Sequence, residues 1–83
     1  MNPLDAQRQY LARRMQAYRD VFEGPNAKIV LADLARFCRA TESTFHPEPA
    51  AANRLDGRRE VWLRINEHLH LDENELWQLK RGA

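Results

Sequence analysis

Four side chains in this sequence are of the types that bind metal ions: Cys38, His46, His68 and His70. Their spacing matches no zinc pattern, because the chain has neither a C-x-x-C pair nor two histidines at H-x3–5-H spacing. His68 and His70 are two positions apart, so on a helix they point in different directions. We therefore expect surface or capping histidines rather than a metal site, and a Cys38 that packs as a small buried hydrophobe.

Nucleophilic catalysis has equally little support in the sequence. Ser43 is the only serine, and neither a G-x-S-x-G elbow nor a phosphate-binding glycine loop is present. A general acid–base pair among the Asp and Glu residues stays open, but a chain of 83 residues has little room for a pocket of about 300–1,000 Å³. We expect no enzymatic activity and no cofactor.

The arginines are the most unusual feature, since eleven of the thirteen basic residues are Arg. Arginine pairs bidentately with carboxylates or phosphates and stacks on aromatic rings, which would suit an interface with an acidic protein or with nucleic acid. The alternative is that they lie on solvated helix faces, in intrahelical pairs such as Glu60 with Arg64 and Asp33 with Arg36. The candidate interaction surface comprises Arg36, Arg39, Phe45, Arg54, Arg58, Arg59 and Trp77.

Charge is distributed unevenly along a chain whose net charge is only +1. Residues 1–41 carry seven basic and four acidic side chains, whereas residues 42–83 carry six basic and eight acidic ones. A mixed-sign surface of this kind fits a protein partner better than a nucleic-acid backbone. The sequence leaves the oligomeric state open, because the two halves could pair within one chain or between copies.

Helical periodicity runs through most of the chain and predicts the elements that position these residues. The first helix is expected from Pro3 to about Glu23, with Asn2 as its N-cap and Gly24 as its stop. The second is expected from Pro25 or Asn26 to about Ala40. Because it is the most apolar segment and follows a short Gly-Pro junction, we expect it to be the central helix and to form an antiparallel hairpin with the first.

A polar loop over residues 41–47 should follow, with Phe45 packed back on the core. A third helix is expected from about Pro47–Pro49 to His68, in which Gly57 marks a close helix crossing or an irregularity. The last helix is short, from Glu73 to Arg81, and begins with an Asp72–Glu75 capping box. The prediction is a single all-α domain over residues 1–83, a compact bundle of three longer helices plus one short C-terminal helix.

Three function classes are disfavoured by composition and pattern. No apolar run approaches the roughly 20 residues that span a bilayer, and MNPLDAQRQY lacks a secretory h-region. The single cysteine fits a reducing compartment. DNA binding by a helix-turn-helix is less favoured, because the connection before the third helix is longer than the usual turn and Glu48, Asp56 and Glu60 lie near its basic residues.

Three blocks of sequence carry a resemblance to a known family: YRDVFEGPNAKIVLADLARFC, STFHP and GRREVWLRI. In this order they resemble small proteins of podovirus-type tailed bacteriophages, whose genes tend to lie near those for head and portal assembly. The resemblance covers roughly residues 18–79. The family pattern often has Gly where Ala27 stands, and it carries no catalytic residues over to this chain.

The resemblance implies a phage accessory protein in the host bacterial cytoplasm or in the virion. With the mixed-sign surface, it favours non-enzymatic protein–protein interaction during virion assembly or genome delivery, with a phage structural protein or a host protein as the partner. Two alternatives remain: an effector that binds host transcription or defence machinery, and a small DNA-binding regulator.

Overall fold

The computed structural model describes residues 2–82 of the chain and contains four α-helices within them. In chain order these are α1 (Pro3–Val21), α2 (Pro25–Phe37), α3 (Pro49–His70) and α4 (Glu73–Gly82). Within residues 2–82 there is no strand. The all-α class, with three longer helices and a short C-terminal one, is therefore confirmed, and the predicted helix ends lie within about three residues of those observed.

Capping side chains set where two of the helices begin. The Oδ1 atom of Asn2 accepts a hydrogen bond of 2.9 Å from the backbone N–H of Asp5 and caps α1. At α4 the predicted capping box is confirmed: Asp72 Oδ1 accepts from Glu75 N at 2.8 Å, and Glu75 Oε1 accepts from Asp72 N at 3.3 Å. The bond from the Glu75 backbone lowers the pKa of Asp72.

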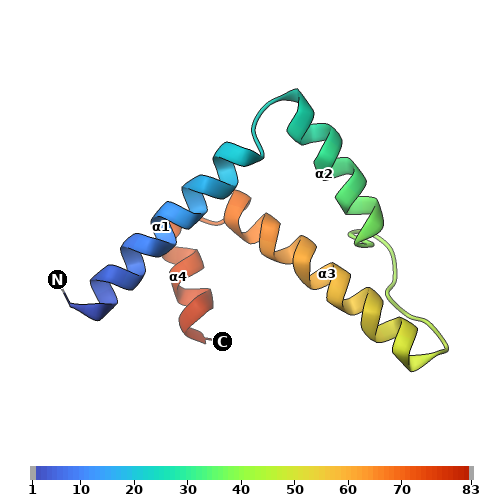
Figure 1. Cartoon of the computed structure of the whole chain (residues 1–83). Coiled ribbons are helices and arrows are strands. Elements are labelled where there is room, and N and C mark those ends of the chain that lie inside the picture. The colour runs from blue at the N-terminus through green and yellow to red at the C-terminus, as the bar shows by residue number, and fades with distance from the viewer. Residues whose placement is uncertain (1, 83) are drawn as a thin grey trace.

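The hydrophobic core lies between the two ends of the chain. Leu11 and Met15 of α1 pack with Leu76 and Trp77 of α4, and Leu71 closes the edge of this cluster. Helix α3 packs against both α1 and α2. Figure 1 shows α1 and α2 diverging from their junction while α3 runs back from the far end of α2 to meet α1.

The expected hairpin between the first two helices is therefore wrong, and so is the central place given to the second. Of the α2 residues only Ala27 is buried, although Cys38 just beyond its end is buried as predicted, while Ile29 is 69% exposed. Gly24 explains the divergence, because its φ of 92° and ψ of 179° are open almost only to glycine and turn the chain away from α1.

These helices form a flattened and open arrangement. The Cα atoms extend 50 × 32 × 15 Å with a radius of gyration of 15.3 Å, whereas a compact domain of this length has a radius of about 12 Å. Packed helix axes lie roughly 8–10 Å apart, so a thickness of 15 Å corresponds to two helices at most. A helix in so thin an arrangement is covered by a neighbour on one side, and its other side is exposed to solvent.

Two glycines provide a matched test of this geometry. Gly57 lies inside α3 with no atom within 4 Å of the position its Cβ would take, so it marks no close crossing; Gly24 has equally open space but a positive φ. We predict that Gly24→Ala lowers the free energy of unfolding by about 1–3 kcal/mol through backbone strain alone. Gly57→Ala should raise it by about 1 kcal/mol through helix propensity. Urea titrations of both variants measure the two effects, and equal shifts would contradict the role of Gly24.

Candidate interaction surface

The loop between α2 and α3, residues 38–48, is tied down in its first half by two arginines. Arg39 has a φ of 54°, the one positive φ at a non-glycine residue in the range 2–82. Its Nη1 donates a hydrogen bond of 3.2 Å to the carbonyl of Ser43, which closes a turn over five residues. The Ser43 hydroxyl in turn accepts from the backbone N–H of Phe45 at 3.0 Å.

Two neighbouring arginines of α3 complete the same surface. Arg59 reaches across to the loop, where its guanidinium donates to the carbonyls of Glu42 at 3.2 Å and Ala40 at 3.4 Å. Arg58 places its guanidinium carbon 4.2 Å from the centroid of the Phe37 ring, a cation–π contact at the end of α2. Side chains of α3 thus fix the first half of the loop and the end of α2.

Phe45 is the most exposed large hydrophobic side chain of this region, at 78%. The expectation that it packs back on the core is wrong, because the loop turns its ring into solvent. Its role as a contact residue stays a prediction. We call the set Phe37, Arg39, Phe45, Arg58 and Arg59 the Arg/Phe surface.

The other three predicted surface residues lie elsewhere or do different work. Trp77 was expected to be an exposed anchor, but it is 5% exposed and belongs to the core. The spacing of apolar residues in the sequence does not show that α4 packs on α1. This packing covers the Trp77 indole. Arg36 and Arg54 are exposed, and within residues 2–82 neither guanidinium has a hydrogen-bond or ion-pair partner. The intrahelical pairs Glu60–Arg64 and Asp33–Arg36 are not formed.

His68 was predicted to be a surface histidine, and the structure shows that it is buried instead, with 1% of its surface exposed. Its ring stacks on Tyr18 of α1 with centroids 4.2 Å apart. Nε2 accepts a hydrogen bond of 3.0 Å from Arg14 Nε, and Nδ1 lies 2.8 Å from the Arg64 carbonyl. Because Arg14 can only donate, Nδ1 must carry the proton and the imidazole is neutral.

A second arginine of α1 extends this network to the junction of α3 and α4. Arg19 donates to the carbonyl of His68 at 3.1 Å and to that of Leu71 at 2.6 Å. We call His68, Arg14, Arg19 and Tyr18 the His68 network. The signal in the sequence was the i+3 spacing of His68 from the buried Ile65, which places both on one helix face; apolar periodicity alone passes over a histidine there.

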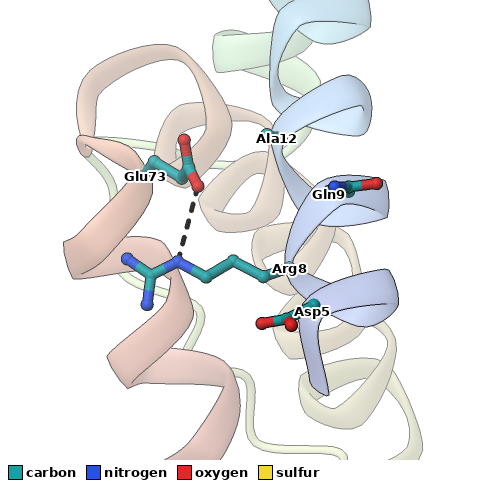
Figure 2. Close-up of a pocket in the computed structure, with 5 residues that line it drawn as sticks. All are labelled: Asp5, Arg8, Gln9, Ala12 and Glu73. Carbon is teal, nitrogen blue, oxygen red and sulfur yellow. Dashed lines mark ion pairs between the residues drawn. The ribbon is translucent and has the colours of Figure 1, made fainter. Parts of the chain in front are cut away.

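A hollow of about 500 Å³ lies between α1 and the start of α4, lined by Asp5, Arg8, Gln9, Ala12 and Glu73 (Figure 2). Arg8 points across it and pairs with Glu73, with Nε and Oε1 3.5 Å apart. The same guanidinium donates to Asn74 Oδ1 at 3.1 Å and lies 5.6 Å from the Trp77 ring. These contacts attach α4 to α1, and the charged groups of the hollow are mostly engaged with one another.

Among the residues that the structure describes, no group of three His, Cys, Asp or Glu side chains is placed to hold a metal ion. His46 is exposed and its Nδ1 accepts from the backbone N–H of Glu48 at 3.1 Å. None of the described helices is both long and apolar enough to cross a membrane.

A protein-family model described as "Bbp19-like phage protein" matches residues 18–81. The chain belongs to this Bbp19-like family. The match covers α2, α3, the loop between them and most of α4, and so includes the whole Arg/Phe surface. The expectation of a phage protein family is thereby confirmed, over nearly the range that the three sequence blocks indicated. No curated protein and no solved structure matches the chain.

The neutral state of His68 gives this Bbp19-like protein a defined pH dependence. Burial is the main cause that lowers the pKa of His68 below its usual 6.5. The unfolded chain therefore binds a proton before the folded chain does, so stability is full above about pH 6.5 and falls as the pH drops toward the lowered pKa. We predict a lower melting temperature at about pH 5 than at about pH 7.5.

His68→Gln should lose most of this difference, although it is less stable at both pH values. His70→Gln, which changes an exposed histidine two residues away, should retain it. Thermal melts followed by circular dichroism measure all three chains. A wild-type chain whose melting temperature is equal at the two pH values would rule out a buried neutral His68.

Proposed function

We propose that this Bbp19-like chain is a non-enzymatic phage accessory protein that binds another phage protein during virion assembly or genome delivery. The observation that carries the proposal is the display of Phe45 from a loop whose preceding backbone is tied down by Arg39 and Arg59. An aromatic ring held in solvent by a fixed loop has no role in the stability of its own chain. It is the kind of side chain that anchors a protein interface.

The chemistry of the Arg/Phe surface also supports a particular kind of partner. Arg39 and Arg59 donate hydrogen bonds to loop carbonyls, and Arg58 lies on the Phe37 ring, while Arg36 and Arg54 nearby in sequence are exposed and are the guanidinium groups most available to a partner. Guanidinium groups pair bidentately with carboxylates, so the partner should offer Asp or Glu side chains around an apolar pocket for the Phe45 ring. We propose further that the phage is of the podovirus type and that the partner is one of its head or portal proteins, as the resemblance of the three sequence blocks implies.

The helix-turn-helix alternative fits these contacts less well. The connection of α2 to α3 spans residues 38–48, whereas a helix-turn-helix uses a turn of about three to four residues. Arg58 rests on Phe37, and Arg59 is bound to loop carbonyls, so neither side chain is free to enter a groove without losing its contact. Phosphate recognition would rest on Arg36 and Arg54.

The test is mass spectrometry of purified phage particles and procapsids beside a pull-down from host lysate, with the tagged chain produced during infection. We predict that the chain co-purifies with particles or procapsids. Phe45→Ala should reduce that recovery by roughly 10-fold or more, as loss of an aromatic anchor does. Leu4→Ala removes another exposed apolar side chain, at the start of α1, and should leave recovery unchanged.

Absence of the chain from both particles and procapsids would overturn the proposal. Capture of a host protein with normal particle formation would favour the effector instead. Binding to duplex DNA with an affinity that falls steeply with salt would favour the regulator. Circular dichroism of Phe45→Ala should match that of the wild type, since the exposed ring supports no packing.

A further inference from the structure

The outer side of α2 is apolar and has no partner within the chain. Ile29 is 69% exposed, Val30 is also exposed, and Asp33 lies one turn further along the same side. Large aliphatic side chains are among those most often buried in folded proteins. We call Ile29, Val30 and Asp33 the α2 stripe.

A complementary surface lies on the neighbouring helix. At the C-terminal end of α1 an apolar hollow of about 280 Å³ is lined by Ala17, Tyr18, Val21 and Phe22, and Val21 is 71% exposed. This volume is below that of a usual small-molecule site, so the hollow suits apolar side chains better than a free ligand. The α2 stripe cannot fold onto it in the same chain, because Gly24 directs α2 away from α1.

The accessible surface of the chain is larger than that of a compact monomer of the same mass, and the difference estimates the area that a second copy could cover. The accessible surface is 6266 Å², whereas a compact monomer of 9.8 kDa exposes about 5,200 Å². The excess is about 1,100 Å² per chain, so two copies that each buried it would remove about 2,200 Å² in total. That total lies in the range of about 2,000–5,000 Å² that permanent homodimers bury.

Charge is compatible with the same pairing. The exposed Arg13 lies one turn before Ala17 on α1, and the α2 stripe carries the exposed Asp33. Each surface carries exposed charges of both signs at its edges, Arg13 and Asp20 on α1 and Asp33 and Arg36 on α2, so opposite charges can face one another across the contact. Because one chain carries both surfaces, a two-fold axis lets each be used twice in a closed, self-complementary interface.

We propose that two copies of this chain form a homodimer in which the α2 stripe of each copy occupies the apolar hollow on α1 of the other. The contact that α1 and α2 do not make within one chain is then made between chains. The interface leaves the 38–48 loop and Phe45 free. It does not rest on the proposed function, and a monomeric chain could still bind a virion protein.

The first experiment is light scattering after size exclusion with the full chain at up to about 100 μM, a concentration that populates dimers of micromolar Kd. We expect a mass of twice 9.8 kDa. Val21→Asp and Ile29→Glu should each raise the dimer Kd by at least about 100-fold, because each buries an unpaired charge in the interface. Both side chains are exposed in the single chain, so the circular dichroism of each variant should keep its helical signal.

Leu4→Glu is the matched control, since Leu4 is exposed but lies away from both surfaces, and it should leave the mass at that of the dimer. A second measurement tests the register. Copies carrying Val21→Cys mixed with copies carrying Ile29→Cys should form a disulfide-linked pair under oxidation, far more than either variant alone. A monomeric wild-type chain, or a dimer insensitive to both charged variants, would overturn the proposal.

Discussion

The neutral imidazole of His68 is the constraint on which the arrangement of α1, α3 and α4 depends. Its two nitrogens bind groups on different helices, because Nδ1 pairs with the Arg64 carbonyl of its own helix and Nε2 accepts from Arg14 of α1. Arg19 then binds the carbonyls of His68 and Leu71, where α3 gives way to α4. A buried polar group costs free energy unless it is paired, so these bonds permit only one orientation of α1 on α3.

The apolar core alone would specify that orientation poorly. Its main cluster consists of Leu11, Met15, Leu76 and Trp77, with Leu71 at its edge. Such a small cluster supplies burial but few directional contacts, whereas the stacking of Tyr18 on His68 and the two arginine bridges are directional. The result is a rigid union of α1, α3 and α4, from which α2 and the 38–48 loop project.

The sequence predicted the local structure well and the packing less well. Caps and glycines are local signals, so the helices, the Asn2 cap and the Asp72–Glu75 box were all predictable. Burial depends on which helix meets which, and periodicity does not determine that. The predictions from periodicity were therefore wrong in making α2 the central helix, in exposing Trp77 and in placing His68 at the surface. Of the candidate site, Phe45 and the arginines beside the loop were named from the sequence, and their role in binding stays a prediction. The hydrogen bonds of Arg59 to loop carbonyls were not predictable, because they depend on how α3 returns to α2.

The placement of the core has a consequence for the order in which the chain folds. Its decisive contacts join residues far apart in sequence: Arg8 to Asn74 over 66 positions and Arg14 to His68 over 54. Helices can form within about a microsecond, but none of these contacts can close until the segment from His68 onward has been synthesised. Helical proteins with local contacts fold fastest, so this chain should fold late and slowly for its class, with a nascent chain that exposes α1 until α4 emerges.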